Sequence, residues 1–410
     1  MPRGGSTREV HLRDQEAYVQ ERMALMNSTP ALDLLLSPEG QALLDALARE
    51  PLGADAELGV ITRYRQRYAP ELVAAALAQI KLRRRARSKF SRADEMYFTG
   101  PGLEQASTER MSRHHARRYT SFKQVADLCS GIGGDLIGLA SRGDVVAVDI
   151  DLVHLRMGML NVQAYGVAGN VKSVHSDVRD VPLTGIDAVF IDPARRSDNR
   201  RFRGTESEPP LEWCIALAQG GLPVGIKAAP RLPSDAVPDD WELEFVSENR
   251  ELKESVLWSP SLRTARRRAT VLPDEQTLID TPGEPLAVRA PGQFLLDPDP
   301  AVTRAGLVEE LGRSLGDIWK IDEQVAFLSS NRPFDTPFGR GLRVEASDPW
   351  NLKRLKETLR RLDVGTIDIR KRGSAVEVEE LQRRLRPSGS RSATVVLTRV
   401  SDRPWAMVCT

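Results

Sequence analysis

Two patterns of hydrophobic and polar residues divide this chain. Up to about residue 112, apolar residues recur at helical spacing, as in Leu32–Leu47 and Glu71–Leu82, and Pro51-Leu-Gly53 interrupts the pattern. From about residue 121, short apolar runs alternate with helical segments. This alternation is typical of βαβ units, so it predicts an α/β fold with a Rossmann-like, parallel, doubly wound sheet.

The apolar runs predict the strands of this sheet: Val125–Leu128, Val145–Val148, Val171–Val174, Ala188–Ile191, Val224–Ile226 and Val256–Trp258. Four of these runs lead into an acidic residue at or just beyond the strand end, namely Asp127, Asp149, Asp177 and Asp192. In sheets of this kind, ligands bind beyond the carboxyl ends of the strands. The four acids therefore mark a predicted binding site.

The remainder of the chain predicts a third region. Residues 273–299 are rich in Pro, Asp and Gly and indicate a linker with some strand character. Beyond them we expect helices over 301–315 and 351–362 and strands over 366–369 and 393–398. The predicted organisation is a helical N-terminal domain (1–112), a Rossmann-like domain (113–272) and a small α+β domain (285–410).

Composition places the chain among ordinary globular proteins. Of its 410 residues, 41% are hydrophobic and 28% charged, and the three cysteines form no CxxC pair. That cysteine pattern argues against a zinc site and against a disulfide framework. We find neither an apolar signal region nor a run near the roughly 20 apolar residues of a membrane helix. A cytoplasmic location is expected, and a net charge of +1 neither requires nor excludes a nucleic-acid partner.

The loop after the first predicted strand carries the clearest chemical signal. Asp127 precedes a turn with the spacing Gly131-x-Gly133-Gly134, and such glycines let the backbone approach a nucleoside ligand. The spacing differs from the G-x-G-x-x-G of dinucleotide sites, and Asp127 would repel a pyrophosphate. S-adenosylmethionine has no phosphate and carries positive charge. We therefore expect a methyl-donor site, which disfavours a nicotinamide dehydrogenase.

The acids after the next two strands extend this site. Asp149 is expected to accept hydrogen bonds from the ribose hydroxyls. Asp177 follows the third strand and either binds the adenine amino group or caps a helix. Asp151 directly precedes a predicted helix, so an N-cap is its preferred role.

The fourth strand ends in Asp192-Pro-Ala-Arg-Arg196, where the methyl acceptor is expected. Asp192 would orient or deprotonate the acceptor, and Arg195 would stack on it or contact a phosphate. An ion pair between Asp192 and one of these arginines is the structural alternative. Transfer of a methyl group requires alignment of donor and acceptor and no metal. Lys227 could contact acceptor phosphate or pair with an acid. For His114-His115 we expect a surface or packing role, because adjacent histidines point to different faces and no acid or cysteine at ligand spacing accompanies them as in a metal site.

Two basic segments are candidate contacts for a nucleic-acid partner. The run Lys81–Lys89 ends the second helical stretch and has two open interpretations, a solvated helix end or a nucleic-acid contact. Residues 353–386 hold eleven Lys or Arg against six acids, which predicts a basic face on the C-terminal domain.

Taken together, the motifs resemble one family, the bacterial class I S-adenosylmethionine-dependent methyltransferases that end in a THUMP-like domain. The resemblance covers the chain from about residue 30 onward, and the catalytic core is also similar to trimethylguanosine synthase. It is carried by these segments: Lys89-Phe90, Met96–Thr99, Gly102–Ala106, His115–Tyr119, Asp127–Asp135, Asp192–Arg196, Trp258-Ser-Pro260, Lys371–Gly373 and Leu397–Arg399.

This resemblance implies an RNA-modifying enzyme, because THUMP domains are RNA-binding modules. It also implies that Phe98 and Thr99, in the segment that folds over the cofactor, contact S-adenosylmethionine. We expect methylation of a nucleotide in structured RNA, tRNA or rRNA. The alternatives are a non-catalytic RNA-binding or assembly protein that retains the fold, and a methyltransferase acting on a protein or small molecule.

Overall fold

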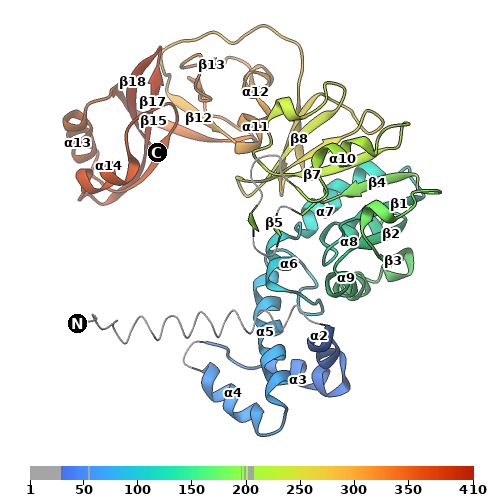
Figure 1. Cartoon of the computed structure of the whole chain (residues 1–410). Coiled ribbons are helices and arrows are strands. Elements are labelled where there is room, and N and C mark those ends of the chain that lie inside the picture. Colours follow the sequence, from blue (N-terminus) through green and yellow to red (C-terminus); the bar gives the residue numbers. More distant parts are fainter. Residues whose placement is uncertain (1–28, 54–55, 195, 198–199, 202–206) are drawn as a thin grey trace, which may run out of the picture. The chain divides into compact units, whose positions relative to one another are not determined.

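The computed structural model describes residues 29–53, 56–194, 196–197, 200–201 and 207–410 (Figure 1). The described residues form two compact units, one comprising those up to residue 201 together with 207–226, and one comprising residues 227–410. Within the described residues, no helix has the length and apolar character needed to cross a membrane. The predicted domain boundaries at residues 112 and 272 stay predictions.

The first unit begins with helices, as the apolar spacing predicted. Their bounds are α2 (Thr29–Leu36), α3 (Pro38–Ala48), α4 (Glu57–Arg65), α5 (Pro70–Ala86), α6 (Gly100–Gln105), α7 (Glu109–Ala116) and η1 (Arg117–Tyr119). The Ser37 side chain accepts a hydrogen bond from Gly40 N at the start of α3, and Pro38 occupies the first turn. Leucines of α2, α3 and α5 form the apolar interior of this helical part.

The Rossmann-like part follows, and strands β1, β2, β3, β4 and β7 of its sheet pair in parallel, whereas the short strands β5 and β6 form a separate antiparallel pair. The strand order is β7-β4-β1-β2-β3. This confirms the first five predicted strands. The elements are β1 (Gln124–Leu128), α8 (Gly134–Ala140), β2 (Asp144–Asp149), α9 (Leu152–Ala164), η2 (Ala168–Asn170), β3 (Val171–His175), η3 (Val178–Asp180), β4 (Ala188–Ile191), β5 (Arg196–Ser197), β6 (Arg200–Arg201), α10 (Leu211–Ala216) and β7 (Val224–Ala228).

The second unit begins with strands of mixed direction, and here one prediction is wrong. The run Val256–Trp258 belongs to β9, which is antiparallel to β8 instead of extending a parallel sheet. The reason is local: Asn249 and Arg250 both have positive φ, 52° and 63°, as a tight hairpin turn requires. The elements are η4 (Ser234–Ala236), β8 (Glu242–Glu248), β9 (Glu251–Trp258), β10 (Arg267–Leu272) and β11 (Gln276–Ile279).

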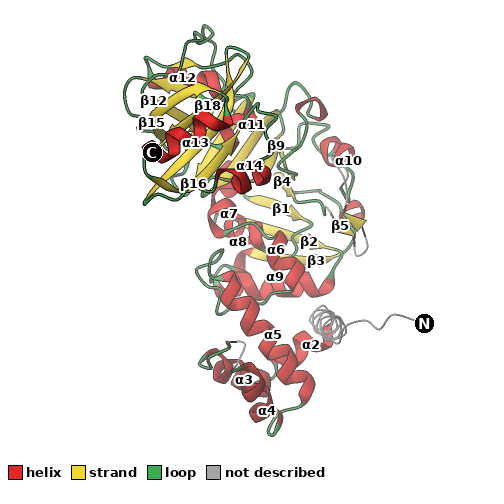
Figure 2. Ribbon diagram, turned by 90° about the vertical axis from the view of Figure 1, so that its left-hand side faces the viewer, coloured by secondary structure: helices red, strands yellow, loops and turns green. Residues whose placement is uncertain are grey.

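The C-terminal part is a seven-stranded sheet of order β13-β14-β12-β15-β18-β17-β16, with helices packed on it (Figure 2). Leu355 and Leu359 of α13 and Leu381 and Leu385 of α14 are buried together with residues of β17 and β18. The bounds are β12 (Phe294–Pro298), α11 (Pro300–Ala305), α12 (Val308–Leu315), β13 (Trp319–Lys320), β14 (Leu328–Ser330), β15 (Gly339–Pro349), α13 (Leu352–Arg361), β16 (Val364–Lys371), α14 (Val378–Leu385), β17 (Arg391–Val400) and β18 (Arg403–Cys409).

The predicted α+β character is confirmed, with one difference in detail. The single helix expected over 301–315 is two helices, because Gly306 ends α11 in the left-handed conformation at φ 68°.

The basic run at the end of α5 is bound internally. Lys81 Nζ lies 2.7 Å from Glu57, and Arg84 donates to Glu50 O at 2.6 Å. Arg83 is buried, donates to Met96 O, and lies over the Tyr97 ring at 4.9 Å. Lys89 Nζ donates to Leu103 O, Glu104 O and Ala106 O, the carbonyls around the end of α6. These contacts favour the structural interpretation of the run over nucleic-acid binding.

Replacing Lys89 by Met should lower the free energy of unfolding by about 1–3 kcal/mol, since three carbonyl groups lose a charged donor. Arg85→Met is the matched control, because its exposed pair with Glu104 at 3.8 Å contributes at most about 1 kcal/mol. Urea denaturation of both variants measures the difference. Equal midpoints would show that Lys89 does not stabilise the fold through these bonds.

Candidate active site

The glycine loop joins β1 to α8 and is built from left-handed residues. Cys129, Gly131 and Gly133 have φ values of 60°, 54° and 86°. A Cβ at Gly133 would lie 3.1 Å from Gly158 Cα, and one at Gly134 would lie 3.0 Å from Ser107 N. A Cβ at Gly131 would meet no atom within 4 Å. Gly133 and Gly134 thus permit close packing, and Gly131 faces open space where a ligand can approach.

Asp149, at the end of β2, holds this loop in place. Its Oδ2 accepts a hydrogen bond from Gly131 N at 2.7 Å, and its Oδ1 accepts one from Asp151 N at 2.8 Å. Burial raises the pKa of Asp149 despite these two bonds. Each carboxylate oxygen keeps a second lone pair for a ribose hydroxyl. Asp127, within β1, is almost completely buried.

Between these acids and α9 lies a residue that sequence reasoning missed. Ile150 is 68% exposed, an unusual state for isoleucine, and it directly follows the strand-end acid. An exposed apolar side chain next to Asp149, the acid predicted to bind ribose, suits the face of an adenine ring. The available signal was an isoleucine between Asp149 and Asp151 in a loop. Asp151 caps α9 as expected, accepting from Val153 N and His154 N.

Asp177, after β3, is already engaged. It caps η3 by accepting from Arg179 N, and Arg179 also donates to both its carboxylate oxygens, at 2.9 and 2.7 Å. This bidentate pair lowers the pKa of Asp177. Arg179 Nη2 lies 2.9 Å from Glu208 Oε1 as well. The geometry supports the capping alternative, and an adenine contact stays a prediction.

Asp192 stands directly after β4, and its backbone N donates to Leu128 O at 3.2 Å, so it borders the glycine loop. The predicted partner Arg195 lies outside the described residues. Asp149 and Asp192 reinforce the effect of burial in raising the pKa of the Cys129 thiol, and burial also raises the pKa of Cys214. Raised thiol pKa values disfavour either cysteine as a nucleophile.

Phe98 and Thr99 expose none of their surface. Phe98 packs near the Phe90 ring, with centroids 5.9 Å apart. Thr99 caps α6 by accepting from Gly102 N, and its Oγ1 lies 2.8 Å from His154 Nε2. Both side chains therefore have structural partners, and their predicted contact with a cofactor gains no support from accessibility.

Two further residues singled out in the sequence have internal partners. His115 is buried, its Nδ1 lies 2.8 Å from Asp135 Oδ1, and its ring stacks on Phe190 at 5.2 Å. Lys227 is buried with its Nζ 3.8 Å from Glu254 Oε2, which favours the ion-pair alternative. Among the residues that the structure describes, no cluster of His, Cys, Asp and Glu could hold a metal ion.

Three segments match known family models. Residues 122–210 match the model described as RNA cap guanine-N2 methyltransferase, residues 339–410 match THUMP domain-like, and residues 28–86 match a domain of unknown function. The fold is similar to the crystal structure of a candidate methyltransferase from Porphyromonas gingivalis W83. That similarity has a TM-score of 0.70 at 21% identity and covers 88% of this chain and 99% of the other.

Two related proteins identify the family to which this chain belongs. Mycobacterium tuberculosis strains H37Rv and CDC 1551 each have an uncharacterised S-adenosylmethionine-dependent methyltransferase that is 35% identical to this chain over 345 residues. The match covers 81% of this chain and 93% of each relative. On this similarity, the chain belongs to the family of S-adenosylmethionine-dependent methyltransferases and uses S-adenosylmethionine as its methyl donor.

Proposed function

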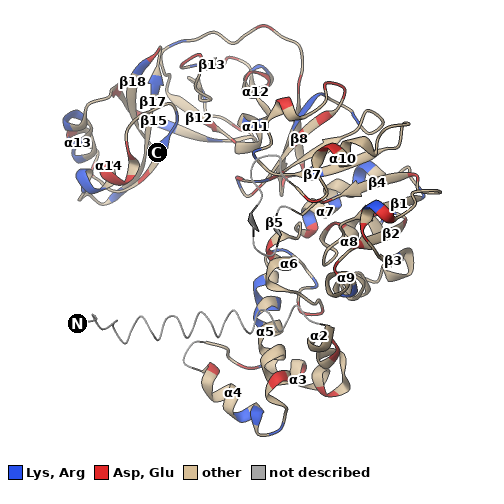
Figure 3. Cartoon of the chain, in the orientation of Figure 1, with Lys and Arg blue, Asp and Glu red and all other residues tan. Residues whose placement is uncertain are grey.

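We propose that this methyltransferase acts on a nucleotide in structured RNA, tRNA or rRNA. The observation that carries the proposal is the surface of α13, in the THUMP-like segment. Lys353, Lys356, Arg360 and Arg361 are exposed there, and in the described part of the chain their side chains have no ion-pair or hydrogen-bond partner. Figure 3 shows the Lys and Arg positions on the α13 ribbon. Their residue spacing places them along one side of the helix. Such a row of cations suits a phosphate backbone.

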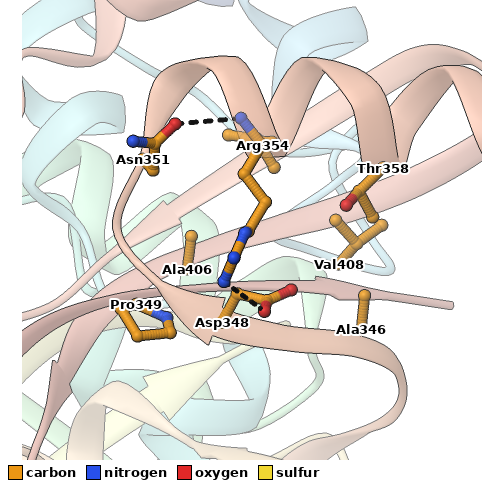
Figure 4. A pocket seen from close by; sticks show the side chains of 9 residues that line it. Ala346, Asp348, Pro349, Asn351, Arg354, Thr358, Ala406 and Val408 are labelled. Atoms are coloured by element: carbon orange, nitrogen blue, oxygen red, sulfur yellow. Dashed lines mark hydrogen bonds and ion pairs between the residues drawn. The ribbon is translucent and has the colours of Figure 1, made fainter.

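The neighbouring Arg354 differs from this row. Its Nη1 lies 3.0 Å from Asp348 Oδ1, and its backbone N donates to Asn351 Oδ1, as Figure 4 shows. Both partners line a small pocket together with apolar residues of β15 and β18. Arg354 is thus partly neutralised, and it provides an internal reference for the free cations of α13.

The match to an RNA cap guanine-N2 methyltransferase model also supports an RNA acceptor, because it includes Asp192 and Pro193. Asp192 would accept a hydrogen bond from the acceptor and position it, or remove its proton. Arg195, which lies outside the described residues, stands where related motifs have the aromatic side chain that stacks bases, and Ala194 stands in place of a proline. We therefore assign neither the base nor the atom.

The donor site fits the proposed reaction. S-adenosylmethionine supplies an electrophilic methyl group. In this chain, Gly131 leaves space for the donor, Asp149 would accept from its ribose, and Ile150 would cover its adenine. Asp127, in β1 just before the loop, would favour a cationic ligand in its ionised form. The chain's contribution to the rate is alignment of donor and acceptor.

Asp149→Asn should weaken binding of S-adenosylhomocysteine about five- to 100-fold, because the amide cannot accept from both backbone N–H groups. Asp151→Asn is the matched control. It removes the same charge nearby but keeps a good N-cap, so its affinity should stay within about threefold of wild type. Isothermal titration calorimetry measures both. Equal affinities for the two variants would remove Asp149 from the donor site.

Transfer of labelled methyl groups to RNA from cells that lack this protein tests the acceptor. We expect label in a tRNA or rRNA fraction, and Asp192→Ala should lower kcat about 100-fold or more with unchanged S-adenosylhomocysteine affinity. Label that enters only protein or small molecules would overturn the RNA proposal. Full methylation by Asp192→Ala would remove Asp192 from the mechanism.

The α13 cations predict a salt-dependent RNA affinity. Replacing Lys353, Lys356 and Arg360 together by Gln should weaken RNA binding and reduce the slope of log Kd against log salt by about 2–3. Arg354→Gln should change the slope by less than about 0.5, since Asp348 already neutralises that guanidinium. Filter binding between low and high salt measures both slopes. The same slope for the triple variant and wild type would place the RNA elsewhere.

A further inference from the structure

Residues Met96–Phe98, here called the strap, run between the helices of residues 28–86 and the methyl-donor site. All of them lie in the first compact unit. The strap is buried and has no regular secondary structure. Its backbone groups must therefore find partners on neighbouring side chains, because water is absent there.

On one edge the partner is Gln79 of α5, which is completely buried. Gln79 Nε2 donates to Met96 O, and Phe98 N donates to Gln79 Oε1, both at 3.3 Å. Arg83, one turn along α5, adds a bond from its Nε to Met96 O at 2.8 Å. Side chains of α5 in the helical domain thus hold the backbone of the strap.

On the other edge the partner is Asn161 of α9, also completely buried. Tyr97 N donates to Asn161 Oδ1 at 2.7 Å, and Asn161 Nδ2 donates to Tyr97 O at 3.0 Å. The same Nδ2 donates to Ile132 O at 2.8 Å, within the glycine loop. One carboxamide therefore joins the strap to the loop that faces the methyl donor.

Helix α9, which carries Asn161, also contacts the glycine loop and Thr99, the residue that follows the strap. His154, Gly158 and Asn161 follow the spacing i, i+4, i+7 and so lie on one face of α9. His154 reaches Thr99, and Gly158 has no side chain where the loop passes: a Cβ there would lie 3.2 Å from Gly131 O. The glycine loop, the strap and α9 are thus packed as one body.

We propose that the helical domain, residues 28–86, sets the position of the glycine loop and thereby the affinity for the methyl donor. The route runs from Gln79 through the strap and Asn161 to Ile132. The carboxamides of Gln79 and Asn161 each donate one hydrogen bond to the strap backbone and accept one from it. A shift of α5 therefore leaves buried polar groups unpaired unless the strap and the glycine loop move with it. Gln79 and Asn161 are positioning residues. The inference rests on the proposed donor site at Gly131 and Asp149.

The test replaces Gln79 by Met, which keeps the volume and removes both bonds. Arg84→Met is the matched control: it lies on the same helix and loses bonds to Glu50 O and Ala48 O, remote from the strap. We expect the affinity for S-adenosylhomocysteine to fall about tenfold in Gln79→Met and by less than about twofold in Arg84→Met. Unchanged affinity in Gln79→Met overturns the proposal.

A second measurement needs no ligand. Amide hydrogen exchange at Gly131 and Gly133 should accelerate in Gln79→Met and stay as in wild type in Arg84→Met. One outcome is that exchange accelerates in Gln79→Met while the wild-type protein does not bind S-adenosylhomocysteine. In that case the donor-site assignment is wrong, and the coupling between the helical domain and the glycine loop is supported. Wild-type exchange rates at both glycines in Gln79→Met refute the coupling.

A double variant tests whether Gln79 and Asn161 act on one route. Combining Gln79→Met with Asn161→Leu should cost less than the product of the two single effects, because both break one route. Independent effects that multiply would show that Gln79 acts by another path.

Discussion

The close approach of α9 to the glycine loop is the constraint on which this molecule depends. Gly133 and Gly158 face each other with no room for a side chain, since a Cβ on either would lie within about 3.5 Å of the other segment's backbone. This contact fixes where α8 starts and where Gly131 N meets Asp149. The shape of the donor site therefore depends on the packing of α9 as well as on the sequence of the glycine loop.

Much of this arrangement could be predicted from the sequence. Apolar runs identified β1, β2, β4 and β7, because strands covered on both faces bury most of their residues. The edge strand β3 is only partly buried, and polar residues separate its two valines. The acids at the strand ends could be placed together because the carboxyl ends of parallel strands lie at the same edge of the sheet. The cap role of Asp151 also followed from its place before a helix.

Other features depend on contacts that no local pattern contains. The antiparallel turn of β9 rests on two left-handed residues, Asn249 and Arg250, of which the second is an unusual choice. The cations of α5 look like a nucleic-acid run in sequence, but their partners are backbone carbonyls far along the chain. Phe98 and Thr99 belong to the expected segment, yet their side chains point into the interior.

The strap has a practical meaning for dissecting the protein. A fragment starting at residue 113 would contain every Rossmann-like strand, and it would also leave the Asn161 amide facing solvent in place of Tyr97. The cavities vacated by Phe98 and Met96 would open beside it. Such a fragment would lack the strap, whose backbone pairs with the Asn161 carboxamide, and it would lack Gln79 and Arg83, which hold the strap from α5. A fragment that keeps these contacts includes the chain from α5 onward.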